Sequence, residues 1–135
     1  MNNSKVIKVV LIVSGLIAAL IGGTIVIIPT AFYTYYGIEL GSNVSLLNEI
    51  RAFGGGLLAT GILIFSGAFI TRMTFTSLVV ATLMYLSYGL SRFISTVIDG
   101  APVEGLVQSA ILEILIGLVC VFALMKYQDR QGKEA

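Results

Sequence analysis

Residues 9–28, VVLIVSGLIAALIGGTIVII, form an apolar run without a charged side chain. A helix rises about 1.5 Å per residue, so about 20 such residues cross the roughly 30 Å hydrocarbon core of a bilayer. Lys5 and Lys8 precede the run, as in a signal peptide. The run is longer than the apolar core of a signal peptide, which is usually about 7–15 residues. Pro29-Thr30-Ala31 is also a poor site for cleavage by signal peptidase. We therefore interpret it as a membrane-spanning helix.

Three further segments have similar length and apolar character, at about residues 49–70, 77–98 and 106–125. The chain of 135 residues is 57% hydrophobic and 11% charged. An average soluble domain is roughly 25% charged. The sequence therefore predicts an all-α integral membrane protein, a four-helix bundle that forms a single domain over residues 1–135.

In a chain that crosses the membrane four times, the basic residues outside the spans would all lie on the same side of the membrane. The set comprises Lys5, Lys8, Arg72, Lys126, Arg130 and Lys133. The loops on the opposite side carry carboxylates and no lysine. Because basic residues favour the cytoplasmic side of a membrane, the sequence predicts an N-in/C-in orientation.

Several classes of site are excluded or disfavoured. The chain has no histidine and one cysteine, Cys120, which excludes disulfide frameworks and Cys/His metal sites. Carboxylates offer ligands for a hard cation, but Arg92 competes for Glu113, so we expect no metal. No nucleophile–base arrangement is visible, and we expect no cofactor. A formal net charge of +1 argues against a nucleic-acid partner.

Arg51, Arg92 and Glu113 lie within the predicted spans. A charge near the bilayer centre costs roughly 2.5–3.5 kcal/mol, so such a side chain faces the bundle and has a partner. Arg92 and Glu113 are each about seven or eight residues from the turn between the last two spans, which places them at matched depth. We predict an ion pair between them. Its role is either to fix helix register or to bind a ligand or handle a proton.

Polar side chains gather in the outer half of the bundle and define the candidate ligand site. Several residues of the third span recur at helical spacing on the face of Arg92. Arg51 either extends to lipid headgroups or joins Arg92 above Glu113 to form an anion-attracting pocket. The candidate ligand-binding residues are Arg51, Tyr85, Tyr88, Arg92, Asp99 and Glu113.

Other residues are assigned structural roles. Small residues let helix backbones approach closely, and ridges such as Ala52–Gly56–Thr60 predict that the first two spans pack tightly. Ser45 is the expected cap of the second helix. The aromatic residues at 32–36 are more typical of an interfacial belt than of a ligand site. The candidate structural residues are Glu49, Gly55, Gly56, Gly100 and Pro102.

Several segments together carry a resemblance to a known family: SGLIA (14–18), YGIEL (36–40), NEIRAFGGGLLATG (48–61), SRFISTVIDGAP (91–102) and a glutamate in the last span. With these segments the sequence resembles the domain-of-unknown-function 4345 family. The most specific matches are Glu49, Arg51 and Gly55 in the second span and Arg92, Asp99, Gly100 and Pro102 around the third; Glu113 fits the acidic position of the fourth. The resemblance implies a small bacterial four-span protein, distantly DoxX-like, in a family without an established activity. DoxX-like relatives include accessory subunits of redox complexes, which is an analogy only.

We expect an uncharacterised multi-pass protein of the bacterial inner membrane that binds a small ligand or serves as an accessory or structural subunit. Two alternatives stay open. One is an oligomeric proton-coupled transporter with Glu113 as its proton site. The other is a membrane enzyme acting on a lipid-soluble substrate, although we favour a protein that is not an enzyme. The expected partners are the lipid bilayer and either further copies of this chain or a larger membrane complex.

Overall fold

The computed structural model describes residues 3–134, which form helices and turns without a strand. The long helices are α1 (Asn3–Ile27), α3 (Val44–Ser66), α4 (Thr74–Asp99) and α5 (Glu104–Glu134). A short helix, α2 (Pro29–Tyr35), follows α1, and a 3₁₀ turn, η1 (Thr71–Met73), leads into α4. The all-α prediction is confirmed, and in this range four helices are long and apolar enough to cross a membrane.

Several helix boundaries differ from the predicted spans, and α5 runs furthest past its predicted end, from about residue 125 to Glu134. α3 begins at Val44, ahead of the predicted residue 49, because the Asn43 side chain accepts a hydrogen bond from the backbone N–H of Leu46 at 3.1 Å. The prediction that Ser45 caps this helix is wrong, since Ser45 already lies inside it. Pro29 ends the first long helix but also begins α2, where its fixed φ suits the first helical position.

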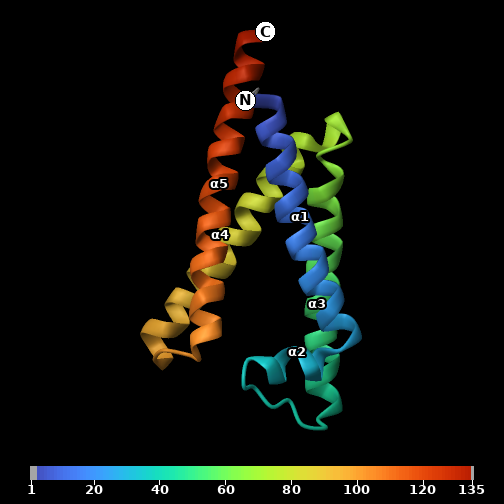
Figure 1. The fold of residues 1–135 in the computed structure, drawn as a ribbon, viewed down its shortest axis with the longest axis vertical. Coiled ribbons are helices and arrows are strands. Elements are labelled where there is room, and N and C mark those ends of the chain that lie inside the picture. The colour runs from blue at the N-terminus through green and yellow to red at the C-terminus, as the bar shows by residue number, and fades with distance from the viewer. Residues whose placement is uncertain (1–2, 135) are drawn as a thin grey trace.

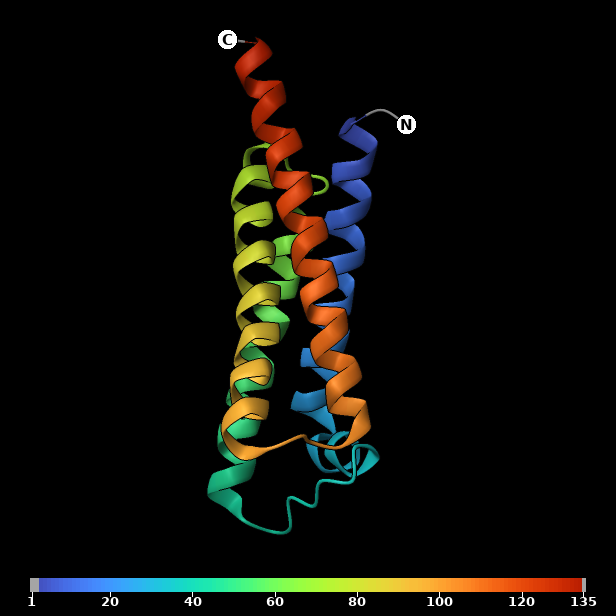
Figure 2. The ribbon, with the colours of Figure 1, turned by 90° about the vertical axis from the view of Figure 1, so that its left-hand side faces the viewer.

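The helices form two antiparallel pairs, α1 with α3 and α4 with α5 (Figure 1). Both pairs run along the long axis of the molecule (Figure 2). The first turn of α1, the last turns of α5 and η1 lie at one end, and α2 lies at the other. The pairs converge toward the end with the termini and diverge toward α2 (Figure 1).

Glycines bring α1 and α3 into backbone contact. A Cβ atom on Gly15 would lie 2.5 Å from the backbone nitrogen of Phe65, and one on Gly54 would lie 3.1 Å from the backbone oxygen of Gly22. The predicted close packing of the first two spans is therefore confirmed. In α3 the expected ridge Ala52–Gly56–Thr60 is not the one used, because Cβ atoms on Gly56 and on the neighbouring Gly55 would meet nothing within 4 Å. Successive helical residues turn by about 100°, so these two glycines face away from the contact made by Gly54.

A hydrogen bond links the two helix pairs near the middle of the molecule. The Tyr85 hydroxyl of α4 donates to the backbone carbonyl oxygen of Ser14 in α1 at 2.6 Å. Leu11, Leu78 and Cys120 are fully buried in the surrounding core. Cys120 thus acts as the small packing residue that the sequence predicts.

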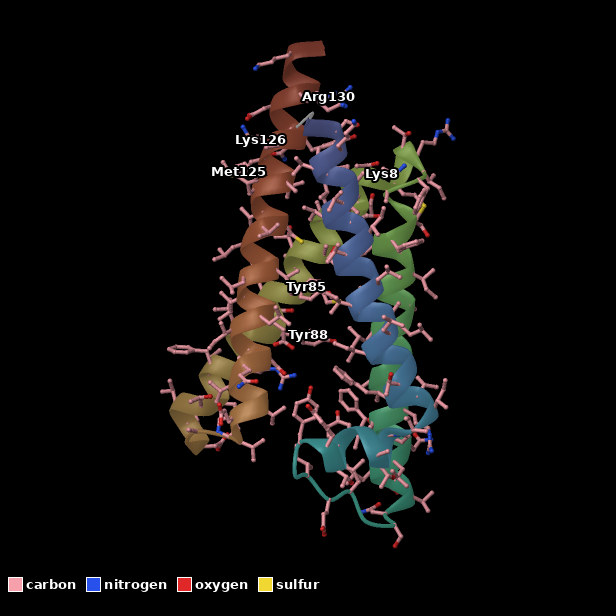
Figure 3. All side chains as sticks on the ribbon, viewed as in Figure 1. Lys8, Tyr85, Tyr88, Met125, Lys126 and Arg130 are labelled. Carbon is pink, nitrogen blue, oxygen red and sulfur yellow. The ribbon has the colours of Figure 1, made fainter. Side chains whose placement is uncertain are left out.

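The loops at the α2 end complete the connections. Gly100 adopts φ 97° after the end of α4, a conformation that glycine reaches without steric cost. Pro102 follows it in the connection to α5, and Glu49 is exposed in α3. At the opposite end, Lys8, Lys126 and Arg130 gather around the first turns of α1 and the last turns of α5 (Figure 3).

Candidate functional site

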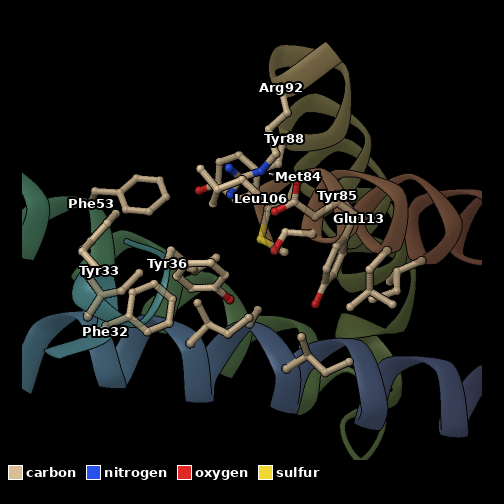
Figure 4. Close-up of a pocket in the computed structure, with 18 of the residues that line it drawn as sticks. Phe32, Tyr33, Tyr36, Phe53, Met84, Tyr85, Tyr88, Arg92, Leu106 and Glu113 are labelled. Carbon is tan, nitrogen blue, oxygen red and sulfur yellow. Dashed lines mark hydrogen bonds and ion pairs between the residues drawn. The ribbon is translucent and has the colours of Figure 1, made fainter. Parts of the chain in front are cut away.

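A cavity of about 370 Å³ lies between the two helix pairs and receives side chains from all five α-helices. Its wall is largely apolar and includes the aliphatic side chains of Ile17, Ile21 and Ile25 of α1. Aromatic surface comes from Phe32, Phe53 and four tyrosines, all of which Figure 4 shows. The charged members of the lining are Arg92 and Glu113.

Arg92 and Glu113 form the predicted ion pair. Nε of Arg92 donates to Oε2 of Glu113 at 2.8 Å, and the two side chains are 37% and 17% exposed (Figure 4). A guanidinium carries five N–H donors, and Nε supplies one of them. Within residues 3–134 the terminal amino groups of Arg92 and Oε1 of Glu113 have no hydrogen-bond partner. The pair therefore presents both donors and an acceptor to the cavity.

The cavity tyrosines fall into two groups. The Tyr85 hydroxyl is already bonded to Ser14, so this side chain holds the helix pairs together. The hydroxyls of Tyr33, Tyr36 and Tyr88 have no hydrogen-bond partner in the part of the chain that the structure describes. The Tyr88 ring packs against Phe53 with ring centroids 5.7 Å apart. These three hydroxyls are available to a bound molecule.

Tyr33 lies outside the long helices and keeps its proton at neutral pH. Burial raises the pKa of its hydroxyl above the ordinary value of 10.0, and the positive charge of Arg92 opposes this shift. A protonated phenol both donates and accepts hydrogen bonds. Tyr33 thus adds an uncharged polar group to the wall of the cavity.

Two of the six candidate ligand residues lie away from the cavity. Nε of Arg51 donates to the backbone carbonyl oxygen of Val26 at 3.1 Å, and this side chain is exposed. Asp99 accepts a hydrogen bond from the Ser95 hydroxyl at 3.2 Å at the end of α4. The structure thus brings Tyr85, Tyr88, Arg92 and Glu113 to one cavity and leaves the other two outside it.

The sequence reasoning missed the contribution of α2. Phe32, Tyr33 and Tyr36 line the cavity, although this segment was expected to form an interfacial belt. The signal lay in their spacing: Phe32 and Tyr33 lie in α2, and Tyr36, the residue that caps its C-terminus, follows at helical spacing on the same face. Tyr35 lies off that face and is 85% exposed.

The described residues contain no group of three or more His, Cys, Asp or Glu side chains that could hold a metal ion. The cavity supplies the groups of its own lining. It combines aliphatic and aromatic walls with an ion pair and phenol hydroxyls.

Comparison with known proteins places this arrangement in a family. Residues 6–124 match the family described as "Domain of unknown function (DUF4345)". The chain belongs to this family. The DUF4345 match includes every residue that lines the cavity. No curated protein and no solved structure shows a significant match to the chain.

Proposed function

We propose that this DUF4345 protein is a multi-pass membrane protein that binds a small amphipathic ligand in the cavity between its helix pairs. The observation that carries the proposal is a largely apolar cavity with a single ion pair in its wall. Small-molecule sites measure about 300–1,000 Å³ and combine apolar walls with a few polar groups. The cavity volume of about 370 Å³ lies within that range.

The apolar outer surface supports the membrane location. Only 17–33% of the most apolar stretch of each long helix is buried inside the protein. Large hydrophobic side chains such as Leu20, Ile98 and Leu83 are 65–74% exposed. Water disfavours such extensive apolar surface, whereas lipid covers it without cost. The membrane that we propose is the bacterial inner membrane.

The charge distribution supports an orientation with both termini in the cytoplasm. Lys8, Lys126 and Arg130 gather at the end with the termini (Figure 3). Basic residues next to membrane spans favour the cytoplasmic side. In this orientation α2 and the polar part of the cavity lie toward the outer face of the membrane.

The binding proposal is tested by filling the cavity from α5. Ser109 lines the cavity, whereas its neighbour Gln108 is exposed and does not. Ser109→Trp should displace the ligand, and Gln108→Trp should not, because only the first indole enters the cavity. Mild extraction of both variants from membranes, followed by native mass spectrometry, compares the mass that stays bound.

The expected result is a bound small molecule on the wild type and on Gln108→Trp, with strong loss on Ser109→Trp. Circular dichroism checks that each variant keeps its helix content. If Ser109→Trp does not fold, Ser109→Phe provides a smaller obstruction at the same position. Equal ligand occupancy in folded variants at positions 108 and 109 would contradict binding in this cavity.

A further inference from the structure

The charges within the cavity sum to zero. Arg92 and Glu113 are the charged residues of the lining, and they are paired at 2.8 Å. The tyrosines beside them are uncharged at neutral pH. An ion pair inside an apolar wall is tolerated because each charge compensates the other. A ligand with a net charge would upset this balance.

The unused hydrogen-bonding groups are of both kinds and lie close to one another. Arg92 offers donors from its terminal amino groups, and Glu113 offers Oε1 as an acceptor. Tyr33 and Tyr88 line the same cavity as Arg92 and Glu113. A head group placed among these side chains meets donors and acceptors together. The α1 wall of Ile17, Ile21 and Ile25 presents only aliphatic surface.

A charged head group would meet opposing forces here. An anion near the free amino groups of Arg92 would also lie near the Glu113 carboxylate, which repels it. A cation near Glu113 would be repelled by Arg92 in the same way. Either ligand would also leave one charge without compensation in a largely apolar cavity. An uncharged polar head avoids both costs and can satisfy the unused groups of the pair.

We infer that the ligand is an amphiphile with an apolar tail and an uncharged head group that both donates and accepts hydrogen bonds. Glycerol esters, primary amides and dihydroxyaromatic compounds have this chemistry. The inference rests on the proposed function and specifies the class of ligand for the same cavity. In this account the ion pair sets selectivity: Glu113 excludes anions and Arg92 excludes cations.

Three probes of equal chain length test the inference: a monoacylglycerol, a fatty acid and an alkylammonium ion. Each competes for the wild-type protein in lipid nanodiscs with a fluorescent monoacylglycerol. We expect the unlabelled monoacylglycerol to bind at least about tenfold more tightly than either charged probe. A fatty acid or alkylammonium ion that binds as tightly as the monoacylglycerol would overturn the inference.

Variants of Arg92 and Glu113 test whether charge, rather than the shape of the cavity, decides which probe binds most tightly. Glu113→Gln leaves Arg92 uncompensated and should make the fatty acid the preferred probe. Arg92→Gln should favour the alkylammonium ion for the converse reason. The double variant has no net charge in the cavity and should again prefer the monoacylglycerol. Gln108→Ala, outside the cavity, should keep the wild-type order of affinities.

The outcomes distinguish the two proposals. An unchanged order of affinities in folded Glu113→Gln and Arg92→Gln proteins would contradict the role of the ion pair but leave ligand binding intact. If one single variant does not fold, the other single variant and the double variant still report the effect of net charge. Absence of binding for all three probes on the wild type would contradict this inference, while the bound mass on Ser109→Trp tests the proposed function separately.

Discussion

Arg92 and Glu113 show what a charged side chain requires within an apolar helix. Each charge alone costs roughly 2.5–3.5 kcal/mol near the centre of a bilayer, so both persist only with compensation. The short connection between α4 and α5 holds the two residues at the same depth, where they form their 2.8 Å ion pair. Their separation along the chain therefore predicted the contact correctly.

The charge of Arg51 is compensated in a different way, by a hydrogen bond to the backbone, and the sequence did not predict this contact. Its side chain donates to the carbonyl oxygen of Val26, near the end of α1. The last carbonyl groups of a helix have no partner within the helix, so they accept from a neighbouring side chain. Only the position of α1 beside α3 makes this carbonyl available. The ligand role expected of Arg51 therefore depended on a three-dimensional contact that the sequence alone cannot supply.

At the scale of elements, matched glycine spacing aligns α1 with α3. Gly15 and Gly22 are seven residues apart in α1, as are Gly54 and Gly61 in α3. Gly15 meets the backbone at Gly61 and Phe65, and Gly22 meets it at Gly54. The helices run antiparallel, so the two pairs of glycines face each other in reverse order. Close approach of this kind replaces the hydrophobic driving force that is absent between helices in lipid.

The substitution Gly61→Ala tests the close contact between α1 and α3, and Gly55→Ala is its matched control. A Cβ atom at position 61 would clash with the backbone of Ala19 and Gly15, whereas one at position 55 would meet nothing within 4 Å. We expect Gly61→Ala to lower the free energy of unfolding by about 1–3 kcal/mol, the usual cost of overpacking. Gly55→Ala should leave it unchanged or raise it by up to about 1 kcal/mol.

Unfolding in mixed micelles with increasing sodium dodecyl sulfate, followed by circular dichroism, measures both variants. A loss of stability of the same size in Gly55→Ala and Gly61→Ala would contradict the observed face of α3. The choice between these faces could not be predicted from α3 alone, because small residues line both of them. The equal spacing of seven residues in α1 and α3 was the available signal.

At the scale of the whole molecule, the sequence predicted four long helices and a polar site around Arg92 and Glu113, but not that this site is a cavity lined from all five α-helices. The helices follow from apolar length, and each antiparallel pair follows from short connections or small-residue ridges. The cavity instead arises because the pairs diverge toward α2 (Figure 1). The two pairs are joined by contacts between residues distant in sequence, such as the hydrogen bond from Tyr85 to Ser14. Local sequence patterns do not specify such contacts.

The proposed orientation makes opposite predictions for the two ends of the molecule. Cysteine is introduced as Ser42→Cys in the loop before α3, or as Gly132→Cys in the last turns of α5, in a Cys120→Ala background. A membrane-impermeant thiol reagent should label position 42 in intact spheroplasts and position 132 only after lysis. Labelling with the reverse pattern would contradict an orientation with both termini in the cytoplasm.

A density map of the wild-type protein in lipid nanodiscs tests the central claim most directly, because it shows the surrounding lipid and the contents of the cavity together. We predict a lipid belt around the four long helices and an elongated density between the two helix pairs. The broader end of that density should lie within hydrogen-bonding distance of the Arg92 amino groups. A cavity closed by direct packing of α4 and α5 onto α1 and α3 would contradict the account.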